Sequence, residues 1–109
     1  MTTAQAETDH RRHLLREMLR IEAARQLVLH AAALKDAKQP CLVEASMAKL
    51  YASEVAERIC SDAIQTLGGA GYIQDFGVER IYRGVRGAKI YEGTNDIQHL
   101  VISRAIARE

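Results

Sequence analysis

The residues of this chain best suited to chemistry form a short stretch immediately before a predicted helix. Residues 90–96 read Ile-Tyr-Glu-Gly-Thr-Asn-Asp. Backbone N–H groups in the first turn of a helix lack partners within that helix and can bind the oxygens of a ligand. Glu92, beside the flexible Gly93, can approach a substrate closely, as a general base must. The residue types alone leave open the ordinary alternative that Glu92 is a solvated or capping residue.

The cysteines and histidines predict no further catalytic site and no metal site. Cys41 and Cys60 stand alone, without a CxxC motif or a histidine at ligand spacing, which argues against a disulfide and against zinc. The histidines lack any spacing typical of metal binding or nucleophilic catalysis, so we expect surface or packing roles for them. They are His10, His13, His30 and His99.

Helices must position the stretch around Glu92. A first long helix is predicted over residues 9–36, where Gly and Pro are absent, and a second over 43–67 after the break at Pro40. Gly68-Gly69 should end the second helix. A loop over 70–77 should lead to a short helix at 78–86, and a last helix should start at Thr94 or Asn95. No strand-like alternation competes, so the predicted class is all-α, an antiparallel helical bundle.

Apolar side chains recur at helical spacing and define the faces expected to be buried. On the first helix they are Leu14, Met18, Ile21, Val28 and Ala32. On the second they are Met47, Tyr51, Val55, Ile59 and Ala63, beside a row of small residues that would let another helix come close. On the last they are Ile97, Leu100, Val101 and Ala105.

Composition is that of an ordinary globular domain. The 109 residues are 48% apolar and 27% charged, and 15 basic against 14 acidic residues give a net charge of +1. This balance predicts neither a nucleic-acid partner nor a membrane surface. No apolar run approaches the roughly 20 residues of a membrane span. The polar amino terminus lacks the apolar core of a signal peptide, so we expect a cytoplasmic protein.

Several blocks, in order along the chain, resemble the C-terminal helical domain of the flavin-dependent acyl-CoA dehydrogenases. They read IEAAR at residues 21–25, SMAKLYASE at 46–54, QTLGGAGY at 65–72, VER at 78–80 and IYEGTNDIQ at 90–98. Residues 1–19 follow the family poorly. We therefore predict a divergent start of the first helix over 1–19 and a dehydrogenase-like domain over 20–109.

The resemblance implies chemistry at an acyl-CoA thioester. In family members with Glu at the position of Glu92, the carboxylate removes a proton next to the thioester carbonyl, and a hydride passes from the β-carbon to FAD. Gly93 matches a position that lies against the substrate. Some branches of the family place the base elsewhere, so Glu92 favours the arrangement of the short- and medium-chain enzymes.

The resemblance also implies a cofactor and partners. FAD contacts are expected in two segments: one holds Gln65, Gly68 and Gly69 and reaches FAD across a subunit boundary, and the other holds Thr94, Asn95 and Asp96. Gly68-Gly69 is equally an ordinary helix stop, and Thr94 and Asn95 are equally ordinary N-caps. Expected partners are further copies of the chain or the missing dehydrogenase domains, and an electron-accepting flavoprotein.

The departures from the family pattern leave two hypotheses. The N-terminal and middle domains are missing, as is the first helix of the C-terminal domain, and Gly77 and Gly84 replace a usual Pro and Asp. One hypothesis is a dehydrogenase lobe that contributes Glu92 and FAD contacts to an assembly. The other is a truncated, inactive helical module that serves oligomer or partner assembly. On either hypothesis the isolated chain should bind FAD weakly or not at all.

Overall fold

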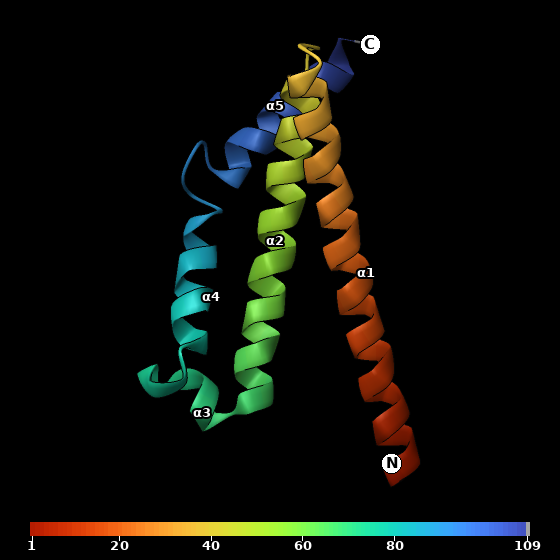
Figure 1. Cartoon of the computed structure of the whole chain (residues 1–109), viewed down its shortest axis with the longest axis vertical. Coiled ribbons are helices and arrows are strands. Elements are labelled where there is room, and N and C mark those ends of the chain that lie inside the picture. Colours follow the sequence, from red (N-terminus) through yellow and green to blue (C-terminus); the bar gives the residue numbers. More distant parts are fainter. Residues whose placement is uncertain (109) are drawn as a thin grey trace.

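The computed structural model describes residues 1–108, and its regular elements in that range are all helices, with no strand. The predicted all-α class is therefore confirmed. Two long antiparallel helices come first, and shorter helices follow them (Figure 1). In chain order they are α1 (Thr3–Asp36), α2 (Leu42–Leu67), α3 (Gly69–Tyr72), the 3₁₀ helix η1 (Gln74–Phe76), α4 (Val78–Gly87) and α5 (Asn95–Ala107).

The first helix begins earlier than residue 9 because its start is capped. Thr2 Oγ1 accepts a hydrogen bond from the Gln5 backbone N–H at 3.2 Å, and the Thr2 N–H donates to Gln5 Oε1 at 2.8 Å. This reciprocal capping box satisfies two N–H groups at the helix start. The sequence carried the signal, since Gln follows Thr2 three residues later, but the apolar periodicity begins only farther along.

The segment 70–77 is more regular than the predicted loop. Gly68 has φ 62° and ends α2 as expected, but α3 and η1 follow at once. Gly71 permits this compact turn, because a Cβ there would lie 2.7 Å from the carbonyl oxygen of Ile64. Gly77 has φ 78°, a conformation closed to the proline that usually stands at this position in the family. The turn into α4 therefore depends on glycine here.

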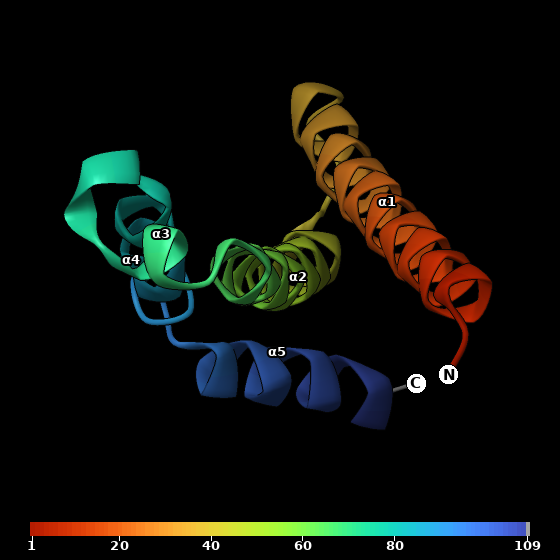
Figure 2. The ribbon, with the colours of Figure 1, turned by 90° about the horizontal axis from the view of Figure 1, so that it is seen from below.

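The helix α2 is the centre of the fold. It contacts α1, α3, α4 and α5, whereas α1 contacts α2 alone among the described elements. Seen along its axis, α2 lies between α1 and α4, and α5 crosses beside it (Figure 2). Small side chains make the closest α1–α2 packing possible, since Ala24, Ala31 and Ala48 are buried.

No helix of residues 1–108 is long and apolar enough to cross a membrane.

Most of the apolar faces predicted to be buried are exposed, which corrects the sequence-based expectation. Exposed members are Leu14, Met18, Ile21 and Val28 on α1, Met47 on α2, and Ile97 and Leu100 on α5. Within residues 1–108, the buried apolar residues are only Ala24, Ala31, Ala48 and Val55. The periodicity correctly marked apolar faces, but a single copy of this chain offers nothing to cover them.

The surface area confirms that the fold is open. The accessible surface is 8337 Å², against about 6,000 Å² for a compact monomer of this mass. The radius of gyration is 17.2 Å, against about 13 Å for a compact domain of this length. The excess area is comparable to that buried in a stable protein–protein interface.

We predict that the chain self-associates at micromolar concentration, because exposed apolar faces of this size mark interfaces. Met18→Glu should shift sedimentation-velocity profiles toward the monomer, since it places a charge on the exposed apolar face of α1. Thr8→Glu adds the same charge to an exposed polar position of α1 and should leave the profile unchanged. A compact, stable monomer for the unmodified chain would contradict the prediction.

Candidate functional site

Glu92 and Gly93 form a turn of unusual backbone conformation between α4 and α5. Glu92 has φ 55° and Gly93 has φ 86°, both in the left-handed region. For a non-glycine residue such as Glu92 this conformation costs about 1 kcal/mol and persists only where surrounding contacts fix it. The Glu92 side chain is exposed, so the turn presents a carboxylate on the surface of the chain.

Two side chains from outside the turn hold its carbonyl groups. Lys49 of α2 donates from Nζ to the Gly93 carbonyl oxygen at 2.7 Å. Gln98 of α5 donates from Nε2 to the same oxygen at 3.2 Å and to the Glu92 carbonyl oxygen at 3.4 Å. A Cβ at residue 93 would lie 2.9 Å from Gln98 Nε2. Glycine therefore suits the φ angle, and any larger residue would have to displace the Gln98 amide from the turn.

A buried polar network joins the same turn to α2. Asn95 is 8% exposed and Ser53 is 6% exposed. Asn95 Oδ1 accepts from Lys49 Nζ at 2.9 Å, and Asn95 Nδ2 donates to Ser53 Oγ at 3.0 Å. The Asn95 backbone N–H donates to the Lys89 carbonyl oxygen at 3.0 Å. Both the side chain and the N–H of Asn95 are thus engaged inside the protein, and its main role here is to dock the start of α5 on α2.

Thr94 and Asp96 lie on the outer side of the same helix start. Thr94 is the N-cap of α5, and its Oγ1 accepts from the Ile97 N–H at 3.4 Å. Thr94 is half-buried and Asp96 is exposed. Of the three residues predicted to contact FAD here, these two remain accessible to a ligand, whereas Asn95 does not offer its side chain.

The other predicted cofactor segment lies far from Glu92 within one copy of the chain. Gln65, Gly68 and Gly69 are exposed at the carboxyl end of α2, and a Cβ on either glycine would meet open space. Gly68 is 19 residues beyond Lys49, which corresponds to about 28 Å along the helix. The fold therefore does not bring the two predicted segments together, as expected if they serve different sites in an assembly.

Lys49, Ser53 and Gln98 were not predicted as site residues. Lys49 and Ser53 are four residues apart and so share one face of α2. A lysine and a serine on a helix face otherwise rich in alanine are a detectable signal. Their partners lie more than 40 residues away, however, and only the fold shows that pairing.

A cluster of charges gives the turn a second attachment to α2. Glu57 of α2 pairs with Lys89, just after α4, with Nζ to Oε2 at 2.7 Å, and with Arg86 of α4, with Nε to Oε1 at 3.4 Å. The Tyr82 hydroxyl donates to Glu57 Oε1 at 3.4 Å. The hydrogen bond from Lys89, with the charges of Lys89 and Arg86, lowers the pKa of Glu57 below its ordinary value, against the opposing effect of burial.

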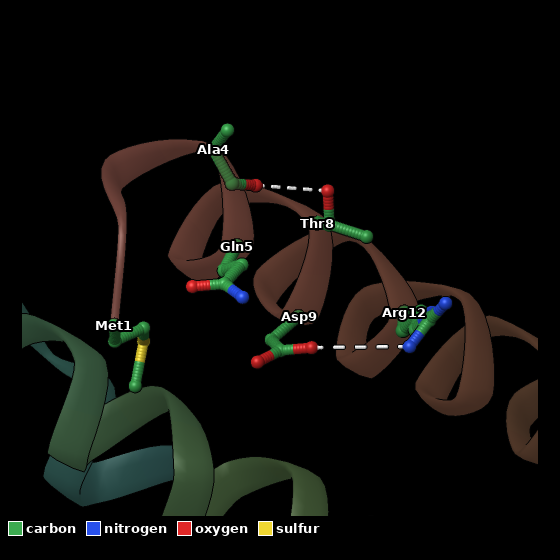
Figure 3. A pocket seen from close by; sticks show the side chains of 6 residues that line it. All are labelled: Met1, Ala4, Gln5, Thr8, Asp9 and Arg12. Carbon is green, nitrogen blue, oxygen red and sulfur yellow. Dashed lines mark hydrogen bonds and ion pairs between the residues drawn. The ribbon is translucent and has the colours of Figure 1, made fainter.

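Two other features support no catalytic chemistry. A hollow of about 680 Å³ beside the first turns of α1 is lined by Met1, Ala4, Gln5, Thr8, Asp9 and Arg12 (Figure 3). Its polar groups already engage one another: Thr8 Oγ1 donates to the Ala4 carbonyl oxygen at 2.9 Å, and Arg12 lies 4.0 Å from Asp9.

Burial raises the pKa of the Cys60 thiol, which disfavours the reactive thiolate form.

Comparison with known proteins gives one consistent result. Residues 4–107 match the family model described as acyl-CoA dehydrogenase, C-terminal domain. Subunit CarC of the caffeyl-CoA reductase-Etf complex of Acetobacterium woodii is 49% identical over 90 residues, 83% of this chain and 24% of CarC. Butyryl-CoA dehydrogenase from Megasphaera elsdenii superposes with a TM-score of 0.82 at 43% identity, over 84% of this chain and 24% of that protein. The FAD complex of PigA gives a TM-score of 0.78 at 37% identity, over 83% of this chain and 24% of PigA. The chain thus spans about a quarter of the length of these relatives.

We predict that the Glu57 cluster stabilises the fold in a pH-dependent way. The pKa of Glu57 is lower in the folded chain than in the unfolded one. Its carboxylate therefore contributes fully to the free energy of unfolding above pH 4.5, the ordinary carboxyl pKa, and this contribution is lost as the pH falls through the lower pKa of the folded chain. Glu57→Gln should lower the free energy of unfolding by about 1 kcal/mol at pH 7 and should flatten its decline in acid. Urea titrations from pH 7 to pH 3 measure both effects. Glu54→Gln, an exposed carboxylate on the same helix, should match the unmodified chain, and identical curves for Glu57→Gln would contradict the assignment.

We also predict that the buried amide of Asn95 is essential for the turn. Asn95→Ala should cost about 2–3 kcal/mol of unfolding free energy, because it removes a buried amide and leaves Lys49 with only the Gly93 carbonyl and Ser53 with only the Leu50 carbonyl as partners. Gln26→Ala removes an exposed amide that bonds only Glu22 and should cost less than about 0.5 kcal/mol. Urea unfolding measures both variants. Equal losses of unfolding free energy would show that the buried network stabilises the fold no more than an exposed hydrogen bond does.

Proposed function

Because this chain belongs to the acyl-CoA dehydrogenase family, as its C-terminal helical domain, we propose that it contributes Glu92 as the general base for α,β-dehydrogenation of an acyl-CoA thioester. The observation that best supports the proposal is the fixed turn at Glu92-Gly93. A strained left-handed glutamate, held by Lys49 and Gln98 through the carbonyls of the turn, is typical of a functional residue placed by its surroundings.

The proposed step is removal of the proton from the carbon next to the thioester carbonyl. The carboxylate of Glu92 accepts that proton, and the electron pair of the C–H bond moves toward the carbonyl oxygen as an enolate develops. A carboxylate is a weak base, so the site must stabilise this oxygen with hydrogen bonds and must exclude water. The exposure of Glu92 here means that the parts excluding water come from outside this chain.

The residues present fit a flavin at two exposed surfaces. Members of the family are FAD-dependent, and PigA, the relative described above, has been solved with FAD. In our proposal Thr94 and Asp96, at the accessible start of α5, contact FAD on the Glu92 side, and Gln65 with Gly68-Gly69 contact FAD in another site of the assembly. The open space beside both glycines suits close backbone approach. Bound FAD supplies the hydride acceptor for the β-carbon.

The proposed activity requires more protein than this chain. The exposed apolar faces of α1 and α5, and coverage of about a quarter of each relative, both indicate that other domains or copies complete the site. The substrate we propose is a short acyl-CoA, in keeping with the butyryl-CoA dehydrogenase similarity. An electron-transferring flavoprotein is the proposed electron acceptor, since CarC belongs by name to an Etf complex.

An inactive assembly module is the second candidate. The small buried core and the wide exposed apolar surface favour it for the chain acting alone. It predicts that no combination with dehydrogenase N-terminal and middle domains yields a flavin-containing complex. Our proposal predicts a yellow complex that reduces its flavin on addition of butyryl-CoA.

The role of Glu92 is tested in that reconstituted complex. Glu92→Gln should retain acyl-CoA binding, because the shape of the side chain is kept, but should lower the rate of flavin reduction by about 10²–10⁴-fold. Glu22→Gln, which removes an exposed carboxylate of α1, should leave the rate unchanged. Stopped-flow absorbance measures both rates. Flavin reduction by Glu92→Gln at the unmodified rate would exclude Glu92 as the base.

A further inference from the structure

A second group of side chains with metal-ligand chemistry lies where α1 passes α2, away from Glu92. His13 and Glu17 are four residues apart and share a face of α1, and Asp62 faces them from α2. His13 Nε2 lies 3.5 Å from Asp62 Oδ2. One ligand atom from each of the three residues lies within 4.8 Å of the other two. An imidazole nitrogen and two carboxylate oxygens therefore converge on one small volume.

Glu17 supplies an independent sign that the volume suits a cation. This residue is only 8% exposed, although glutamate is rarely so buried without full pairing. Its Oε1 accepts from Arg20 Nη1 at 2.6 Å, but its Oε2 is buried and has no hydrogen-bond partner. Buried carboxylate oxygens are normally satisfied by a donor or by a metal ion. The unpartnered oxygen belongs to the same side chain that joins His13 and Asp62.

We propose that His13, Glu17 and Asp62 bind one divalent transition-metal ion, with Zn²⁺ as the best match. Zinc takes histidine nitrogen and carboxylate oxygen at about 2.0–2.2 Å, usually in a tetrahedron. Two ligands of such a tetrahedron lie about 3.3 Å apart, close to the 3.5 Å that already separates the His13 and Asp62 atoms. One Glu17 carboxylate oxygen lies within 4.8 Å of both atoms, so it must move closer to complete the set.

The ligand set also discriminates between classes of metal. Calcium and magnesium prefer sites made of oxygen alone, and magnesium keeps several of its waters. An imidazole ligand favours zinc and its transition-metal neighbours. Three protein ligands leave a fourth tetrahedral position for water. His13 and Asp62 are each more than 40% exposed, so an ion can enter from solvent.

Zinc at this place would have a structural consequence. The two long helices lie close near their connecting loop and diverge toward the amino terminus of α1 (Figure 1). The site joins the amino-terminal half of α1 to the carboxyl-terminal half of α2, at the diverging end. His13 and Glu17 also line a groove of about 440 Å³ between the two helices, together with apolar residues such as Leu14, Met18 and Ile59. Bound metal would fix the width of this groove.

The proposal departs from the sequence-based expectation of no metal site. His13 and Glu17 have the i, i+4 spacing of paired ligands, but Glu17 also pairs with Arg20, and the third ligand is 45 residues farther along the chain. Only the antiparallel packing of α1 on α2 brings Asp62 to the other two.

The experiment titrates ZnCl₂ into the metal-free 109-residue chain by isothermal calorimetry at pH 7.5. The expected result is one zinc per chain, and a melting temperature that rises by at least about 5 °C at a zinc concentration a hundred times Kd. His13→Gln, Glu17→Gln and Asp62→Asn should each weaken binding at least tenfold and abolish the thermal shift. Because His13 and Asp62 are partly exposed, these two variants should fold, which circular dichroism checks.

His30→Gln is the matched control, because it removes an exposed histidine of the same helix and should leave zinc affinity unchanged. Loss of affinity in His30→Gln equal to that in His13→Gln would overturn the proposal. So would absence of zinc binding by the unmodified chain, or binding that survives all three ligand substitutions, as expected if the free thiols of Cys41 and Cys60 hold the metal.

Discussion

The hydrogen bonds from Lys49 to the Gly93 carbonyl oxygen and to the buried Asn95 side chain are the interactions on which the candidate active site depends. They join the middle of α2 to the turn that carries Glu92. Without them, the left-handed turn at Glu92 would be held only by the longer hydrogen bonds from Gln98 of α5. The Glu57–Lys89 pair secures the same connection from the other end of the turn. The geometry of Glu92 is thus determined by α2, the helix that every neighbouring helix contacts.

The same dependence on one central helix explains why the fold is open. Most of the buried residues of the fold are small or polar, and large apolar side chains on α1 and α5 remain exposed. Burial of a few alanines contributes little hydrophobic free energy, because the effect scales with apolar area. We propose that the domain gains much of its stability from other domains or copies. In our proposal the same partners close the site around the exposed carboxylate of Glu92.

The sequence predicts the main helices and places Glu92 just before the last of them, because periodicity, Pro40 and Gly68 are local signals. It missed the capped start of α1 and the short helices after Gly68, which depend on individual contacts more than on pattern. The sequence pattern also does not distinguish apolar residues that are buried within one chain from those that remain exposed, since both show the same helical spacing. The network of Lys49 and Asn95 joins residues 46 positions apart, and only the folded chain reveals it.

In our proposal the α2 network places Glu92 for proton removal, and α-proton exchange tests this placement most directly. The measurement follows deuterium uptake at the α-carbon of a bound acyl-CoA in D₂O, in the complex reconstituted with the missing domains. Lys49→Met keeps Glu92 but removes the shorter of the two hydrogen bonds to the Gly93 carbonyl oxygen. Exchange should then slow by at least about tenfold through misplacement of the base, while acyl-CoA affinity stays unchanged. Exchange at the unmodified rate in Lys49→Met would contradict the account, because the base would then be placed without the network.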